Sequence, residues 1–153
     1  MAETRITPIE INNPYKARAY RSSYIDQGDA TWTKVSLNAE SYDTNNNFDI
    51  TTNYRYDVPV DGYYLVNGSV YMTGVGLSAV QCYLAKSGTV FCYGSYCYGA
   101  DGAVGISKAT DIVYLTAGQY IELYSYGNCT PGGIRVQGGE SLTYLSICLI
   151  SKT

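Results

Sequence analysis

Short runs of strand-forming residues, each ended by a turn signal, constrain this chain more than any other feature. The runs are rich in Tyr, Val, Ile and Leu, and the breaks between them hold Gly, paired Asn or Pro-Gly, as at 128–133 and 137–140. No window repeats apolar residues at i, i+3, i+4 and i+7 over three turns, which is the pattern of an amphipathic helix. We therefore predict an all-β, antiparallel sandwich.

Composition supports the all-β class and argues against nucleic-acid and membrane partners. The 153 residues include 18 Tyr and 16 Gly, which suit strands and tight turns. This length corresponds to one domain that buries roughly two thirds of its unfolded surface. With a formal net charge of −3, the chain repels phosphates, so we expect no nucleic-acid partner. No apolar stretch reaches membrane-spanning length, so we expect no membrane partner either.

Two predicted strands, 63–72 and 142–150, carry apolar side chains on both faces. In the first, Tyr64 and Val66 share one face while Tyr63 and Leu65 share the other. Covering both faces needs a third layer or a neighbouring subunit, and the chain is too short for a third layer. Alternatively, individual tyrosines simply fill strand positions. We predict self-association through Tyr63, Leu65, Tyr71, Tyr144, Leu145 and Ile147.

The order of several motifs resembles that of C1q/TNF-like jelly-roll domains. An aromatic-Thr-Lys-Val strand at 32–35 leads to Asn38, then to a Tyr-Asp turn at 42–48, and then to a Val-Pro corner before a Gly-x-Tyr strand at 56–70. Downstream, 112–123 resembles the family's Leu-x-x-Gly-Asp-x-Val-x-Leu hairpin and 141–150 its closing strand. The resemblance spans about residues 16–150, with 49–54 as an insertion. It implies a homotrimeric jelly roll, from a phage or bacterial member of the family.

The number of cysteines helps to predict the cellular compartment and the redox state of the thiols. There are five, and the first residues show no apolar segment of a secretion signal, so we expect reduced thiols and synthesis in a cytoplasm. With no histidine and no CxxC pair, a zinc site lacks its usual ligands. Cys92 and Cys97 either bridge or act as isolated small core residues.

Catalysis has few candidate residues here. The absence of histidine removes the commonest general base and every Ser/His or Cys/His pair. The carboxylates closest in sequence are Asp26 with Asp29 and Asp57 with Asp61, and their neighbours Gly28 and Gly62 favour turn roles instead. We therefore expect no catalytic residues and a protein that is not an enzyme.

Calcium is the one cofactor that the resemblance raises, because some C1q-like domains bind it in loops. The candidate carboxylate ligands are Asp101 and Asp111, but the sequence lacks the ligand spacing of an EF-hand. We expect no cofactor, with calcium as the alternative.

The first residues differ from the rest of the chain. Residues 1–14 hold Pro8, Asn12, Asn13 and Pro14 and few apolar side chains, whereas 15–153 carry the jelly-roll pattern. Pro and Asn favour an extended chain, so we predict an arm that anchors the domain through Ile6, Ile9 and Ile11. A mobile tail or an edge strand at 9–11 is the alternative.

Three functions fit these features. The first is a non-enzymatic structural protein of a virion, made in the host cytoplasm. It would be a trimeric knob that decorates a phage capsid or forms a head or tail fibre, and it would bind other virion proteins through its arm. The second is a tip that attaches to a host receptor or glycan, with Tyr93, Tyr96 and Tyr98 stacking on sugars. The third is a bacterial C1q-like surface or spore-coat adhesin.

Overall fold

The computed structural model describes residues 15–98, 104–130 and 132–153, and within them the chain forms strands and no helix. The all-β prediction is confirmed. The predicted arm, 1–14, lies outside the described residues. The strands are β1 (Lys16–Tyr20), β2 (Ile25–Gln27), β3 (Thr33–Lys34), β4 (Ala39–Asp43), β5 (Phe48–Asp49), β6 (Arg55–Asp57), β7 (Gly62–Thr73), β8 (Leu77–Lys86), β9 (Thr89–Tyr93), β10 (Cys97–Tyr98), β11 (Val104–Leu115), β12 (Tyr120–Cys129), β13 (Ile134–Val136) and β14 (Tyr144–Lys152).

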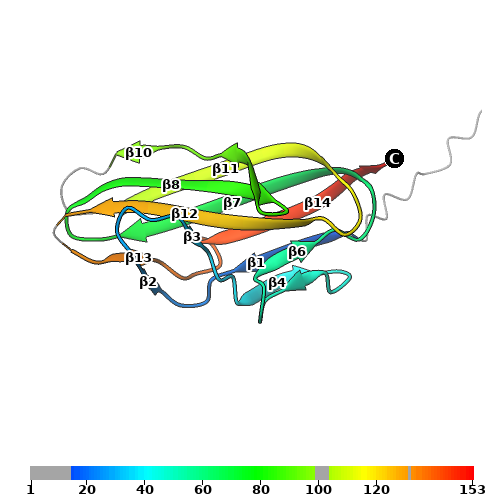
Figure 1. The fold of residues 1–153 in the computed structure, drawn as a ribbon. Helices are drawn as coiled ribbons and strands as arrows, with labels where there is room; N and C mark the ends of the chain where they lie inside the picture. Colours follow the sequence, from blue (N-terminus) through cyan, green and yellow to red (C-terminus); the bar gives the residue numbers. More distant parts are fainter. Residues whose placement is uncertain (1–14, 99–103, 131) are drawn as a thin grey trace, which may run out of the picture.

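Two antiparallel sheets form the sandwich. In sheet A, β7 pairs with β11 on one side and with β14 on the other, followed by β1 and β4, while β13 and β2 extend from the end of β7. In sheet B, β8 pairs with β12 on one side and with β9 and β10 on the other; β6, β5 and β3 follow β12. Figure 1 shows the long strands β7, β8, β11, β12 and β14 running the length of the molecule.

Turn chemistry explains how neighbouring strands connect. The hairpin between β8 and β9 has a two-residue turn, Ser87 and Gly88, with φ values of 49° and 80°. Two positive φ angles in succession are the geometry of the turn that matches the twist of paired strands. Between β4 and β5, the Asp43 carboxylate accepts the Phe48 N–H at 2.7 Å and closes the predicted Tyr-Asp turn.

Side chains from both sheets meet in one core. On β7, Tyr64, Val66 and Met72 are buried, while Tyr63 and Leu65 on the opposite face are exposed. The two sheets approach closely at Gly68, where an added Cβ would lie 2.7 Å from Leu123 Cδ1 on sheet B. Each buried Val or Leu stabilises the fold by about 1.5–3 kcal/mol, so this core carries most of the stability.

The closing strand β14 corrects one part of the predicted interface. Leu145 and Ile147 are 0% and 1% exposed and belong to the core. Ile147 pairs with Val66 of β7, and directly paired residues point to the same side of a sheet. Leu145 and Ile147 therefore face the interior, and the prediction that they contact a neighbouring subunit is wrong.

Among the described residues, no helix is long and apolar enough to cross a membrane.

Candidate functional site: the outer face of sheet A

An apolar patch covers part of the outer face of sheet A. Tyr63 and Leu65 of β7 pair with Tyr114 and Ile112 of β11. These side chains are 46%, 40%, 40% and 58% exposed, respectively. The two tyrosine rings meet edge to face, with centroids 5.4 Å apart. Large apolar side chains thus lie side by side on a surface that the described residues leave exposed.

The first residues of β11 have small side chains facing the core and large apolar ones facing outward. Its buried positions include Gly105, Ser107 and Ala109, whereas Val104 and Ile106 point outward and are each 44% exposed. Small inward residues are required because sheet B lies close behind: an added Cβ on Gly105 would collide with Val80 of β8. Large aliphatic side chains therefore occupy outward positions of this strand, where they add apolar surface to the outer face of sheet A.

A hollow of about 230 Å³ continues this face across β7, β14 and β4. In register, Cys148 lies opposite Leu65 and Ser146 opposite Asn67, and the phenol of Tyr42 borders the same hollow. Polar contacts mark the edges of the patch, where Thr110 Oγ1 donates to Asn67 Oδ1 at 3.0 Å. We call this surface the sheet A face. It consists of the outward residues Tyr63, Leu65, Ile112 and Tyr114 and the hollow beside them, which Tyr42 borders.

The predicted interface residues divide between this face and the core. Tyr63 and Leu65 are exposed on the sheet A face, and Tyr71 and Tyr144 are half-buried on the same side. The structure adds exposed large apolar residues that the sequence did not single out, namely Tyr42, Val104, Ile106, Ile112 and Tyr114. The available signal was the alternation of small and large residues in 104–109.

The predicted ligand-contact tyrosines lie at one edge of sheet B. Tyr93, Tyr96 and Tyr98 are 61%, 47% and 85% exposed. Tyr96 and Tyr98 contact each other, with ring centroids 4.9 Å apart, and Tyr93 points from β9 toward a different neighbour. Ser107 Oγ donates to Ser95 O at 2.6 Å and ties this edge to β11.

Two of the thiols, those of Cys82 and Cys92, are poorly suited to nucleophilic chemistry. Burial raises the pKa of the Cys82 thiol to about 11 and also raises that of Cys92. Both therefore remain protonated at neutral pH, and the thiolate is the reactive form. Cys92 and Cys97, both among the described residues, form no disulfide.

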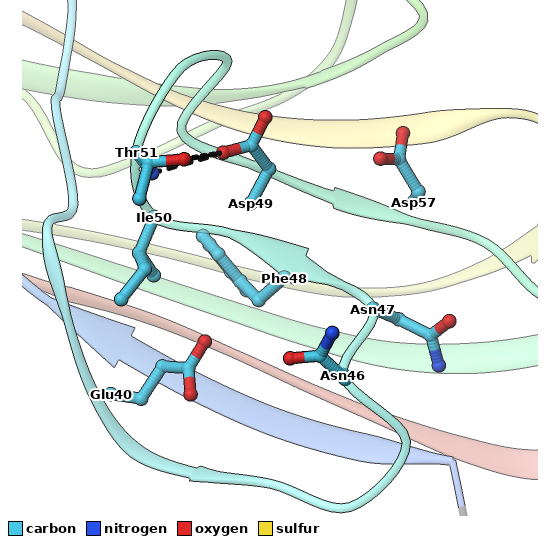
Figure 2. A pocket seen from close by; sticks show the side chains of 8 residues that line it. All are labelled: Glu40, Asn46, Asn47, Phe48, Asp49, Ile50, Thr51 and Asp57. Atoms are coloured by element: carbon cyan, nitrogen blue, oxygen red, sulfur yellow. Dashed lines mark hydrogen bonds between the residues drawn. The ribbon is translucent and has the colours of Figure 1, made fainter.

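A second hollow, of about 450 Å³, lies beside the turn between β4 and β5. Figure 2 shows Glu40 on one side of it and Asp49 and Asp57 on the other, with Phe48 and Ile50 between them.

The carboxylates of this hollow do not work as a pair. Asp49 accepts N–H bonds from Thr52 and Thr51, both at 2.9 Å, and these hold its pKa well below the ordinary value. Asp57 forms an ion pair with Arg55 at 2.9 Å. Partial burial, with Asp43 nearby, raises the pKa of Glu40.

The carboxylates singled out from the sequence also have structural partners. Asp26 lies 3.0 Å from Arg135, Asp29 accepts the Cys129 N–H at 2.7 Å, and Asp61 accepts the Ala117 N–H at 2.7 Å. For calcium, Asp101 lies outside the described residues, and Asp111 accepts the N–H of Ile112. Within 15–98, 104–130 and 132–153, no group of three His, Cys, Asp or Glu side chains is placed to hold a metal ion.

Comparison with solved structures identifies the fold. It is similar to the Eiger TNF of S. frugiperda, with a TM-score of 0.70 and 10% identity over 91% of this chain and 94% of that chain. It is also similar to the globular domain of zebrafish complement 1qA (TM-score 0.61, 11% identity, 91% and 99% of the two chains) and to murine APRIL (TM-score 0.66, 12% identity, 88% and 99%). No family profile and no curated protein matches the sequence. The chain therefore has the C1q/TNF-like jelly-roll fold, as its motifs predicted.

Proposed function

We propose that this protein is a non-enzymatic structural protein of a virion, a homotrimeric knob that decorates a phage capsid or forms the head of a fibre. The proposal of a trimer rests on the sheet A face, where Ile112 and Leu65 are exposed on paired strands. Contiguous apolar surface of this kind is typical of a protein interface. The virion role rests on fold analogy, since jelly rolls recur in virus particles.

The exposed groups suggest how the copies meet. Tyr98, Val104 and Ile106 project from the edge formed by β10 and β11, while the hollow bordered by Tyr42 and Leu65 lies across sheet A from that edge. When this edge of one copy fills the hollow of the next, the contact is head-to-tail, and it forms a ring when the rotation between copies closes. The family resemblance supplies the number of copies, three.

A binding role without catalysis agrees with the chemistry of the described residues. The chain has no histidine, burial raises the pKa of the Cys82 thiol, and Asp29 and Asp61 each accept a backbone N–H. The anchoring role of Ile6, Ile9 and Ile11 stays a proposal from sequence. Three weak arm contacts on one trimer would add up through avidity.

The first test is the mass of the protein by light scattering during dilution. We expect a trimer that persists to nanomolar concentration, because an obligate apolar interface resists dissociation. A folded monomer at micromolar concentration would contradict the assembly.

The second test separates the knob from its attachment. A variant lacking residues 1–14 should remain trimeric but fail to bind particles that lack the protein. Undiminished binding would reject the anchoring role, and loss of the trimer would place the arm in the core fold. Detection of the protein in purified particles by mass spectrometry tests the virion role directly; its absence there would favour a surface or spore-coat adhesin.

The alternative function is a tip that binds a host receptor or glycan. The observation that favours it is the exposure of Tyr93, Tyr96 and Tyr98, since rigid phenol rings supply contact area at low entropic cost. If Tyr96 and Tyr98 pack inside the trimer instead, replacing both with Ser lowers the melting temperature of the assembly. A change in stability thus separates the two roles.

A further inference from the structure

A cluster of aromatic rings covers part of the outer face of sheet B. Trp32, just before β3, contacts Tyr83 of β8, Tyr126 of β12 and Tyr93 of β9, with ring centroids 4.6, 5.2 and 6.1 Å apart. Tyr83 also stacks on Tyr124 at 4.7 Å. We call this group the Trp32 cluster.

The indole lies over the sheet with part of its surface free. The core residues on β8 and β12 alternate with Tyr83 and Tyr126, so these tyrosines point away from the core. Because its ring neighbours all project from the same face, half-buried Trp32 rests on that face and its remaining surface points away from the sheet. Tyr93 extends the surface and is 61% exposed.

The segment that carries Trp32 is held in place. The Ala30 N–H donates to Gly127 O at 2.9 Å, and the Asp29 carboxylate accepts the Cys129 N–H at 2.7 Å. Gln27 adds a bond from its Nε2 to Ser125 O at 3.3 Å. These contacts with β12 fix the indole before any ligand arrives, which lowers the entropic cost of binding.

The chemistry of this surface differs from that of the sheet A face. Among the described residues, the exposed large aliphatic side chains lie outside β8, β9 and β12. The outward aliphatic residues of these strands are Ala79 and Ala85, which are buried, and Val90, which pairs with Ala85 and is half-buried. Polar groups accompany the rings instead: Gln81 lies opposite Tyr126, and the Lys34 Nζ and Glu122 Oε1 atoms are 2.8 Å apart. The paired charges cancel, so the surface favours neither anions nor cations.

We propose that Trp32, Tyr93 and Tyr126 form a binding platform for a neutral oligosaccharide. A sugar ring has an apolar C–H face, which packs on aromatic rings, and a rim of hydroxyl groups, which bond to carboxamide and phenol groups such as those of Gln81 and Tyr126. An aliphatic protein partner would find little matching surface here, because Val90 is the one large aliphatic side chain among the described residues of this face and is half-buried. Single-stranded nucleic acid, which also stacks on rings, needs a positive groove that this surface lacks.

The chain provides its own probe, because Trp32 is its one tryptophan. The full-length protein is first applied to a printed array of neutral oligosaccharides. The sugar with the strongest signal is then titrated while tryptophan fluorescence is recorded. We expect saturable binding that changes the Trp32 emission, whereas binding without any emission change, or no binding to the array, would overturn the proposal.

Matched variants locate the site. Tyr93→Ala should weaken binding at least tenfold, and Tyr93→Phe, which keeps the ring, should weaken it much less. Tyr24→Ala is the control, since Tyr24 is 54% exposed and packs on Arg135 rather than on the Trp32 cluster. Because Tyr93 is largely exposed, its replacement should leave the melting temperature near that of the wild type. Weaker binding in Tyr24→Ala and unchanged binding in Tyr93→Ala would place the site outside the Trp32 cluster and overturn the assignment.

Discussion

Leu65 and Ile112 lie directly opposite one another on β7 and β11, and both side chains point away from the core. Opposed residues on neighbouring strands form the contact unit of a sheet surface. Here that unit is aliphatic and exposed, so a second molecule that covers it would remove apolar surface from water without rearranging either strand.

Replacing Ile112 with Asp should convert the trimer into smaller species. A carboxylate buried at an apolar interface without a partner costs several kcal/mol, whereas in a free subunit it would remain in water. Light scattering at micromolar concentration measures the change, and circular dichroism verifies the strands. Thr89→Asp, on an exposed site of β9, is the control. An Ile112→Asp protein as trimeric as the wild type would exclude this surface from the interface.

Replacing Leu145 with Asp should abolish the soluble fold, since Leu145 is fully buried between the sheets. The unpaired charge would cost several kcal/mol, a large share of the stability of a single domain. Glu40→Ala, on partly exposed β4, should remain folded. Thermal melts of both variants provide the comparison. A Leu145→Asp protein that melts near the wild type would contradict the inward orientation of this side chain.

Replacing Gly105 with Ala should destabilise the protein by about 1–3 kcal/mol, as overpacking in a core does. The added methyl group would collide with Val80, which packs against β11 from sheet B. In a Val80→Ala background the same change should cost less, because the truncation removes Cγ2, the nearest atom, and leaves only Cβ at 2.9 Å from the added methyl group. Urea unfolding of the four proteins in this cycle measures the coupling. Equal costs in both backgrounds would show that the sheets do not meet at this point.

Alkaline pH should weaken the fold through Cys82. Burial raises the pKa of its thiol from 9.0 to about 11, so between these values the unfolded chain releases a proton that the folded chain retains. Stability is therefore fully present below pH 9 and falls as the pH rises toward 11. Melting temperatures from pH 8 to 11 should decline less steeply in Cys82→Ala than in the wild type. Parallel declines would assign the effect to other groups, such as the buried tyrosines.

The sequence alone determined the strands and much of their orientation. Alternation in 63–72 assigned Tyr64 and Val66 to one face and Tyr63 and Leu65 to the other, because side chains in a strand alternate between faces. Ordered motifs from Trp32 to Ile150 predicted the jelly roll, and the comparisons agree.

The tertiary structure decided which faces are inside and which residues meet. Both sides of 142–150 are apolar, so its sequence could not place Leu145; pairing with Gly68 of β7 turns it inward. The sequence of 104–109 shows alternating small and large residues, but the reason for the small ones, the close approach of Val80 to Gly105, exists only in the folded domain. Trp32, Tyr83, Tyr93 and Tyr126 meet only because the sheet brings β8, β9 and β12 together. Contacts between residues far apart in the chain are set by strand order, and strand order comes from the packing of the whole domain.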